Sequence, residues 1–493
     1  MKNLPKYPSL YQINTRVWLT ELSRNLGRKA TLDDIPDFEL DEIASLGFDW
    51  VWLLSVWQTS EASRKVSLEN PDFRKSFEKT LPDLKEEDIG GSGFAIAEYK
   101  VNPAIGGEEA LKKFRKRLKK RNIRLMLDFV PNHMGLDHFW VHSHQKYFVE
   151  GTEKDFENQP QIFTHVKIWG GNAVLAHGRD PNFAGWPDTL QIDYSNQSAV
   201  NAMAKELVKI SKKCDGVRCD MAMLILPEVF EKTWGRKALP FWPEVIKTIR
   251  EKLPDFCFMA EVYWDMEWTM QQLGFDYAYD KRLYDRLLEG HATPVREHFF
   301  ADIDYQDKLA RFLENHDESR ASMEFEQEKH EAAAVITYLS PGLRFFHQGQ
   351  FEGRKAHISP HLVRAPKEPV DESIQQFYYN FLEVLKKPVF RDGQWKLVEC
   401  AQAWEGNESH HDFLVFYWEK EKEASSLVVV NFADHFSQCY IHLPLPDPEG
   451  STLRLQDLVG TFSYDGDGGD LLTNGLYLDM PGWGYQVFEI SYL

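Results

Sequence analysis

Cysteine is scarce in this sequence, and the few cysteines form no recognisable pattern. Only five occur in 493 residues, the number is odd, and no C-x-x-C pair is present. Disulfide frameworks use even numbers of cysteines, and thiolate metal sites use close pairs. The sequence therefore predicts neither kind of site at Cys214, Cys219, Cys257, Cys400 and Cys439.

Long apolar runs are also missing, and so is any excess of positive charge. No apolar stretch reaches the roughly 20 residues that span a membrane. Residues 1–10 lack the basic-then-apolar pattern of a signal peptide. The formal net charge is -19, whereas polyanion-binding proteins are normally basic. We expect no nucleic-acid partner, no membrane segment and a cytoplasmic location, with the question of an upstream signal left open.

The basic run at residues 112–124 does not change this expectation. Leu111, Phe114 and Leu118 recur at helical spacing within and beside it. The run therefore predicts an outer helix with a solvated, charged face.

Short apolar runs do occur, and they alternate with longer amphipathic segments. Alternation of this kind is typical of parallel βα units, and eight such units predict an α/β fold, a (β/α)8 TIM barrel. The eight candidate strands are residues 11–18, 48–56, 123–130, 216–219, 256–261, 275–279, 309–313 and 343–346.

Two further segments interrupt or follow this alternation. Residues 131–194 are rich in Gly, Asn, His and aromatics with little helical period, which indicates a B domain inserted after strand 3. Beyond about residue 390 the pattern becomes β-rich and predicts a C-terminal antiparallel β-sandwich. The predicted domains are a catalytic barrel at 1–130 and 195–385, the inserted B domain at 131–194 and the β-sandwich at 388–493.

Charged residues stand at the ends of four predicted strands. Asp128 ends the third, Arg218 and Asp220 the fourth, Glu261 the fifth, and Asp317 follows the seventh. In a (β/α)8 barrel these ends meet at one mouth, where such enzymes react. One aspartate could simply cap the next helix, but four coincident clusters are poorly explained by capping.

Paired carboxylates of this kind suit the cleavage of a glycosidic bond. An acid with a raised pKa protonates the leaving oxygen, and an ionised carboxylate attacks the anomeric carbon. Arg218 lies two residues before Asp220, so both side chains share a face of the strand and the guanidinium can keep the carboxylate ionised. Glu261 follows the apolar run 256–260, and a dry setting there would raise its pKa.

These segments resemble the four signature segments of the α-amylase family of retaining glycoside hydrolases (family 13 type) and transglycosidases. They occur in the family's order, and the similarity spans roughly residues 8 to 355. The matching stretches are Asp-Phe-Val-Pro-Asn-His at 128–133, Gly-Val-Arg-Cys-Asp at 216–220, Ala-Glu-Val at 260–262 and Asn-His-Asp at 315–317.

The resemblance implies catalytic roles for three carboxylates. Asp220 would be the nucleophile, Glu261 the acid/base, and Asp317 would bind sugar hydroxyls and tighten in the transition state. Arg218 would orient Asp220, and Asp128 would be a structural partner behind the site.

The resemblance also implies a set of substrate-binding residues. His133 and His316 would hydrogen bond to the same sugar ring as Asp317. Phe94 is a candidate platform for that ring, in place of the tyrosine common in the family. Tyr263 and Trp264 directly follow the acid/base segment and are candidates for stacking on the leaving-group side.

The sequence departs from the family at its expected calcium site. Many members carry Lys-His where this chain has Met223 and Leu224, and the histidine carbonyl often ligates calcium. Asn132, a calcium ligand in many members, is retained. We predict no required cofactor, with calcium left open, and no metal at the His-rich stretch 137–144, whose open loop gives weak zinc geometry.

The predicted function is hydrolysis of α-glucosidic bonds, most simply α-1,4 bonds, in an α-glucan or oligosaccharide. Two alternatives stay open: an α-glucanotransferase or sugar isomerase that uses the same site, and a non-catalytic carbohydrate-binding subunit. The retained carboxylates argue against the last. Water exclusion separates hydrolysis from transfer, and the sequence does not fix it. Nor does it fix linkage, chain length or oligomeric state.

Overall fold

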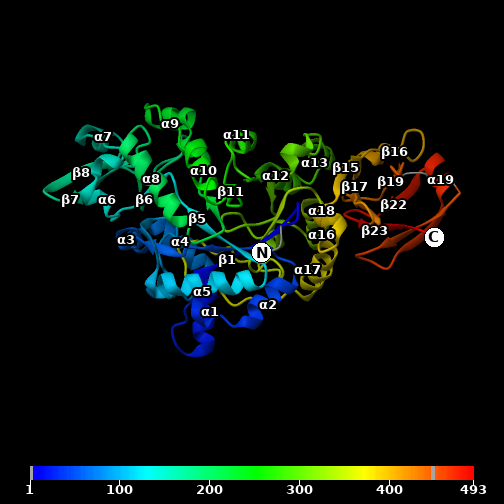
Figure 1. Ribbon diagram of the computed structural model, residues 1–493, viewed down its shortest axis with the longest axis horizontal. Coiled ribbons are helices and arrows are strands. Elements are labelled where there is room, and N and C mark those ends of the chain that lie inside the picture. The colour runs from blue at the N-terminus through cyan, green and yellow to red at the C-terminus, as the bar shows by residue number, and fades with distance from the viewer. Residues whose placement is uncertain (1–3, 446–449) are drawn as a thin grey trace.

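The computed structural model of the protein describes residues 4–445 and 450–493 (Figure 1). Residues 1–3 and 446–449, which fall within the predicted barrel and sandwich, lie outside the described part.

Eight parallel strands close into a barrel in the order β1-β14-β13-β12-β11-β10-β5-β2. This confirms the predicted (β/α)8 fold, because each strand overlaps one of the eight predicted runs. The strands are β1 (Ser9–Asn14), β2 (Trp50–Leu54), β5 (Arg124–Phe129), β10 (Gly216–Cys219), β11 (Cys257–Ala260), β12 (Tyr277–Tyr279), β13 (Leu309–Arg311) and β14 (Leu343–His347).

The first strand lies earlier in the chain than its predicted range, 11–18. β1 ends at Asn14, and helix α1 (Thr15–Leu26) begins at the next residue. The Asn14 side chain accepts a hydrogen bond from the backbone N–H of Val17 (3.2 Å), which caps the helix and ends the strand. Trp18 therefore packs on the buried face of a helix rather than on a strand.

Helices surround the barrel, and apolar side chains fill its interior. Trp50, Trp52, Met126, Met259 and Phe345 belong to the interior cluster and are almost fully buried. A filled interior leaves the mouth as the place for chemistry. The main surrounding helices are α2 (Asp37–Ser45), α5 (Gly107–Lys120), α8 (Gln197–Ile210), α10 (Trp242–Arg250), α12 (Lys281–Glu289), α16 (Gln327–Tyr338) and α17 (Glu372–Leu385).

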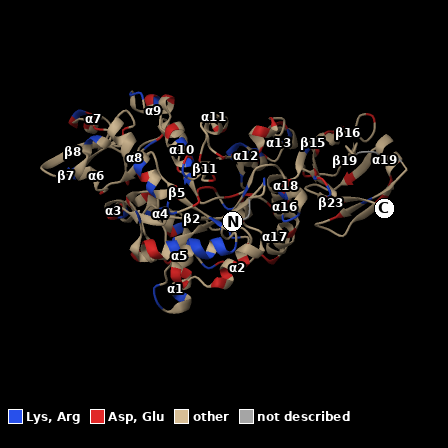
Figure 2. Ribbon diagram, in the orientation of Figure 1, with Lys and Arg blue, Asp and Glu red and all other residues tan. Residues whose placement is uncertain are grey.

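The basic run predicted as an outer helix is α5, where Lys and Arg gather on the surface (Figure 2). Several of its charges are matched by acidic neighbours. Arg117 lies 3.0 Å from Asp37, and Arg121, at the C-cap, lies 2.6 Å from Asp41. These pairs fasten α5 to α2.

The long segments after β2 and β5 carry small elements of their own. A hairpin and a two-stranded sheet fall in residues 131–194, and β7 and β8 lie at the end of the molecule opposite the C-terminal sheets (Figure 1). The exact B-domain boundaries stay a prediction. The elements are β3 (Trp57–Thr59), α3 (Glu61–Glu69), α4 (Pro71–Thr80), β4 (Ile96–Val101), β6 (His133–Gly135), α6 (Trp140–Ser143), α7 (Glu153–Asn158), β7 (Phe163–Ile168), β8 (Gly171–Ala176) and β9 (Thr189–Gln191).

The C-terminal segment forms the predicted antiparallel sandwich, with a 6-stranded sheet facing a 3-stranded one. A separate apolar cluster that includes Val429, Ile441 and Leu478 lies between the two sheets. The sheet orders are β15-β17-β18-β23-β20-β21 and β16-β19-β22. Their bounds are β15 (Gln394–Val398), β16 (Cys400–Gln402), β17 (Phe413–Glu419), β18 (Ser425–Asn431), β19 (Ser437–Ile441), β20 (Thr452–Asp457), β21 (Ser463–Asp467), β22 (Leu476–Met480) and β23 (Tyr485–Tyr492).

The larger sheet of the sandwich packs on the barrel. Trp418 of β17 is fully buried, and its indole N–H donates to the carbonyl oxygen of Leu339 (2.9 Å). Its ring meets Tyr7 edge-on at 5.2 Å. The short helix α18 (Pro388–Asp392) leads from the barrel into this sheet, and its Phe390 also touches Trp418.

Across residues 4–445 and 450–493, no helix is both long and apolar enough to cross a membrane.

Candidate active site

The register of three neighbouring strands brings the predicted site residues together. Arg218 on β10 lies opposite Asp128 on β5 and Met259 on β11. The strands approach closely at Gly216, where a Cβ atom would lie 2.9 Å from Cys257 and 3.1 Å from the Trp50 ring. Arg218 therefore sits at the mouth between two carboxylate-bearing strands.

Four carboxylates surround the Arg218 guanidinium. Nη1 lies 2.7 Å from Asp220 Oδ1 and 3.8 Å from Asp128 Oδ1. Nη2 lies 2.7 Å from Glu261 Oε2 and 3.9 Å from Asp317 Oδ2. The structure thus brings the three predicted catalytic carboxylates to one cation, with the buried Asp128 beside the same guanidinium.

Aromatic rings enclose the guanidinium on its remaining sides. Its central carbon lies 5.3 Å from the Trp52 ring and 5.2 Å from the Phe94 ring. Nε donates to the Tyr279 hydroxyl at 3.4 Å. Arg218 is fully buried, so these rings exclude water and strengthen its attraction to the carboxylates.

Glu261 is held by donors on both carboxylate oxygens. Oε2 accepts the backbone N–H of Met221 at 2.6 Å, and Oε1 accepts the Tyr263 hydroxyl at 3.0 Å. Burial raises the pKa of Glu261 to about 8; Arg218 opposes this shift, while Asp220 and Asp317 add to it. A carboxyl that keeps its proton near neutral pH suits a general acid.

Met221 adopts a backbone conformation that is rare for its residue type. Its φ is 42°, in the left-handed region, directly after Asp220. Non-glycine residues there carry strain of order 1–3 kcal/mol, which the surroundings must offset. The turn directs the Met221 N–H to Glu261, and the next N–H, of Ala222, donates to the Glu261 carbonyl oxygen at 2.9 Å.

The three carboxylates differ in exposure. The side chains of Asp220 and Glu261 are 8% and 4% exposed, whereas that of Asp317 is 41% exposed. Asp317 therefore lies on the open side of the cluster, where a ligand would arrive.

His316 is buried beside Asp317 and has one nitrogen to spare. The Gln12 amide N–H donates to Nδ1 at 2.8 Å, so the ring proton belongs on Nε2. Burial and the nearby Arg218 hold the pKa of His316 well below its usual value, which keeps the ring neutral. Nε2 lies 3.1 Å from Asp317 Oδ2 yet has no hydrogen-bond partner among the described residues.

The remaining predicted binding residues differ in burial and in their contacts with the carboxylate cluster. His133 is buried, with its pKa lowered by burial and its ring 5.2 Å from Trp186. The Phe94 ring packs 5.3 Å from His316, against the catalytic cluster. Tyr263 donates its hydroxyl to Glu261, and stacking of its ring on a leaving-group sugar stays a prediction. Trp264 is 43% exposed in a left-handed turn, with φ 61°.

Sequence reasoning missed several contributors. Gln12, which fixes the tautomer of His316, is a buried polar residue within a predicted strand, and that is a usable signal. Tyr279 ends β12, so the strand-end argument could have included it. The sequence gives no sign of the roles of Trp52 and the Met221 N–H. Trp52 looks like any other apolar residue of a buried strand, and a backbone N–H is present at almost every residue.

The expected calcium position does not fit a calcium ion. Asn132 Oδ1 and its carbonyl oxygen both accept from the Gln191 amide, at 3.0 and 2.9 Å. Asp193, two residues after Gln191, pairs with Arg236 at 2.9 Å. Calcium needs six to eight oxygen ligands, and here amide and guanidinium donors already use these oxygens.

A cluster with possible metal ligands lies elsewhere. Glu408, His410 and His411, on the C-terminal domain, have ligand atoms within 4.8 Å of one another, but two of the three residues are exposed. These three residues are not part of the candidate active site.

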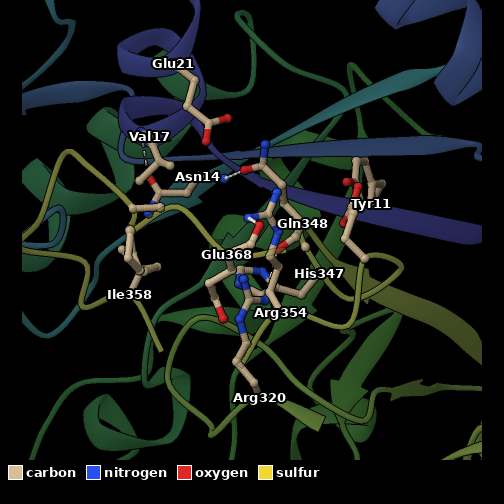
Figure 3. A pocket seen from close by; sticks show the side chains of 14 residues that line it. Tyr11, Asn14, Val17, Glu21, Arg320, His347, Gln348, Arg354, Ile358 and Glu368 are labelled. Atoms are coloured by element: carbon tan, nitrogen blue, oxygen red, sulfur yellow. Dashed lines mark hydrogen bonds between the residues drawn. The ribbon is translucent and has the colours of Figure 1, made fainter. Parts of the chain in front are cut away.

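A polar hollow of about 140 Å³ lies beside the mouth, between β1, β14 and the segment after β14 (Figure 3). Arg320 donates to the carbonyl oxygens of Gln348 (2.9 Å) and Ala356 (3.2 Å), and it pairs with Glu314. Arg354 donates to the Glu368 carbonyl oxygen at 3.0 Å. Both arginines fasten the segment after β14, so we assign this hollow a structural role.

Comparison with known proteins agrees with this geometry. Residues 31–424 match the family model of the alpha-amylase catalytic domain. Alpha-amylase 3 of Dictyoglomus thermophilum is 23% identical over 305 residues, 57% of each chain. Alpha-amylase MalA of Haloarcula japonica is 21% identical over 433 residues, 86% of this chain and 55% of its own. The chain thus spans little more than half the length of these relatives.

Solved structures share the fold over nearly the whole chain. A maltogenic alpha-amylase AmyB from Thermotoga neapolitana superposes with a TM-score of 0.69 at 17% identity, covering 99% of both chains. An alpha-amylase from Geobacillus thermoleovorans, complexed with acarbose, gives 0.68 at 18% identity, with the same coverage. Together with the family match over most of the sequence, these findings show that the chain belongs to the alpha-amylase family.

Proposed function

We propose that the protein is a retaining α-glycosidase that hydrolyses α-glucosidic bonds in glucans or oligosaccharides. Asp220 is the nucleophile, Glu261 the acid/base and Asp317 the residue that binds sugar hydroxyls in the transition state. One observation carries this proposal: a single buried guanidinium, that of Arg218, contacts Asp220 and Glu261 at 2.7 Å each.

This bridging favours retention of configuration. Retaining pairs have carboxyl groups about 5–5.5 Å apart, and inverting pairs about 6.5–9.5 Å apart, to admit a water. Two carboxylates that share one guanidinium stand close together, with little room for a water between carboxylate and sugar. Direct attack by Asp220 on the anomeric carbon fits this arrangement better.

The contacts around Glu261 indicate which oxygen carries the proton. Oε2 receives the Met221 N–H and lies beside Arg218, so a proton there would face two donors. The proton therefore belongs on Oε1, next to the Tyr263 hydroxyl. In the first step Oε1 protonates the leaving oxygen while an Asp220 oxygen bonds to the anomeric carbon. In the second, Glu261 takes a proton from water, whose oxygen displaces Asp220.

The balance of charge suits the transition state. Four carboxylates lie within 4 Å of one guanidinium, so negative charge is in excess when most of them are ionised. A glycosyl centre that gains positive character is stabilised by that excess. The partnerless Nε2–H of His316 and the exposed Asp317 carboxylate offer a donor and an acceptor to the same sugar ring. We propose that these steps require no metal or cofactor.

The substrate class rests on the relatives. Two matched relatives are named alpha-amylases, and one solved relative is complexed with acarbose. We therefore favour α-1,4-linked glucans. Transfer to a sugar acceptor is the second candidate, because an alpha-1,4-glucan:maltose-1-phosphate maltosyltransferase of Burkholderia pseudomallei also matches, at 23% identity over 60% of this chain.

A substrate panel tests the proposal. Starch, pullulan, maltose, isomaltose, sucrose and trehalose would be incubated with the wild-type chain and with Asp220→Asn. We expect glucose or maltooligosaccharides from starch, and loss of about 10⁴-fold or more in turnover for the variant with an unchanged melting temperature. Oligosaccharides longer than the substrate, or isomerised disaccharide, would favour transfer. Near-normal turnover by Asp220→Asn would refute the assignment.

A further inference from the structure

The C-terminal domain lies at the end of the molecule away from β7 and β8 (Figure 1). A second hollow, of about 770 Å³, opens on this domain. It is lined from β19, β22 and helix α19 (Gly468–Thr473), and from the opposing strands of the larger sheet. None of its lining residues touches the carboxylate cluster around Arg218.

Aromatic side chains at this hollow are partly exposed, as judged within residues 4–445 and 450–493. Tyr440 and Tyr477 lie directly opposite each other on β19 and β22, with ring centroids 5.3 Å apart and planes inclined by 54°. Tyr477 is 45% exposed, and Phe462, which also lines the hollow, is 49% exposed. Two inclined rings make an open angle whose apolar faces suit the C–H faces of pyranose sugars.

The charged residues that line the hollow limit the classes of ligand that it can bind. Its described lining residues include no Lys or Arg, so an anionic ligand would find no fixed cation. Asp470 is the single carboxylate among them, and its Oδ1 already accepts from the Asn474 amide at 2.6 Å. Gln402, His442 and Asn474 add hydrogen-bonding groups to the lining, and the amides of Gln402 and Asn474 already donate to Glu408 and Asp470. Aromatic faces beside neutral donors and acceptors fit an uncharged polyhydroxy ligand.

We propose that this hollow is a second carbohydrate site, which binds a segment of an α-glucan chain away from the catalytic cluster. The choice of α-glucan rests on the proposed function, whereas the sugar class rests on the lining residues. A site on a separate domain cannot contact a short substrate held at Arg218. It raises the effective concentration of a polymer whose chains reach both sites, so its influence grows with substrate length.

Affinity electrophoresis in native gels that contain amylopectin tests this site. All chains would carry Asp220→Asn, so that the polymer is not consumed. We expect Tyr440→Ala with Tyr477→Ala to weaken amylopectin binding about ten-fold, from the loss of two aromatic contacts. Phe436→Ala is the matched control, because Phe436 is 65% exposed on the same domain but does not line the hollow. Phe462→Ala alone, at a surface position, should also weaken binding if the double variant fails to fold.

Retardation of the hollow variants equal to that of Phe436→Ala would overturn the proposal. The proposal would also be overturned if the hollow serves self-association. In that case sedimentation would show the hollow variants changing from dimer to monomer while their amylopectin binding stays unchanged. Turnover of maltotriose by the hollow variants with Asp220 intact should stay at the wild-type value. An inactive wild-type chain that still binds amylopectin through Tyr477 would refute the proposed catalysis and leave the second site standing.

Discussion

The residues around Glu261 show how hydrogen bonds and burial together determine the pKa of a carboxyl group. The hydroxyl of Tyr263 and the N–H of Met221 both stabilise the ionised form, while burial opposes it more strongly and keeps the pKa near 8. The sequence predicted the acid/base and its dry setting. It could not predict that the Tyr263 hydroxyl reaches Glu261, because the residue types fix neither the rotamer of Tyr263 nor the left-handed turn that follows at Trp264 and Asp265.

The pH dependence of kcat/KM tests this balance. The first step needs protonated Glu261, so activity should be retained below its pKa and fall as pH rises through about 8. Tyr263→Phe removes a hydrogen bond that favours the charged form, so the fall should move to higher pH, by about one unit. Initial rates on a soluble maltooligosaccharide between pH 5 and about 10 would measure both.

Tyr194→Phe is the matched control for that shift. The Tyr194 hydroxyl is buried too, but it donates to the backbone carbonyl of Pro131 at 2.9 Å. Its loss should lower stability without moving the alkaline fall in activity. An equal shift in both variants, or none in Tyr263→Phe, would contradict the role given to Tyr263.

Strands and helices were more predictable than side-chain directions, for a physical reason. Barrel strands are buried on both faces and read as continuous apolar runs, so all eight could be found. The boundary error at Asn14 arose because the apolar run continues into the buried face of α1. Short exposed strands such as β16 and β21 carry too few apolar residues to be predicted, so the division of the sandwich into sheets was not foreseen.

Gly342, the residue directly before β14, lies so close to β13 that only a glycine fits there. Its φ is 114°, and a Cβ atom there would run into the carbonyl oxygen of Leu309 on β13. We expect Gly342→Ala to lower the free energy of unfolding by about 3 kcal/mol, from strain and steric conflict together. Gly235→Ala is the control: φ is 64° but nothing lies within 4 Å, so its cost should be about 1 kcal/mol. Urea titrations of both variants would measure the difference, and equal midpoints would contradict this account.

In the whole molecule, the larger sheet of the sandwich shares the apolar core of the barrel that carries the candidate active site. Residues of β17 and β18, including Phe416 and Val428, belong to the same buried cluster as the barrel helices. The sequence predicted both parts. The continuous apolar runs of β17 and β18 indicate that both faces of the larger sheet are covered, but they do not say which element covers the outer face.

This shared core predicts that barrel and sandwich unfold together. Trp418→Ala should destabilise the protein by about 3–5 kcal/mol, because it removes a fully buried ring and its bond to Leu339. Activity and β-sheet circular dichroism should be lost at one lowered temperature. Trp404→Ala, at a residue 55% exposed, should change stability by less than about 0.5 kcal/mol. Separate transitions for activity and sheet structure would contradict the shared core.

The central claim is that Asp220 forms a covalent bond to the sugar. The most direct measurement is mass spectrometry of the digested protein after reaction with 5-fluoro-α-glucosyl fluoride, which forms slowly hydrolysed glycosyl-enzymes. The account predicts one added 5-fluoroglucosyl group, with release of the anomeric fluoride, on the peptide that contains Asp220, and loss of activity in proportion to labelling. Labelling of a different carboxylate, or full inactivation with Asp220 unmodified, would contradict it.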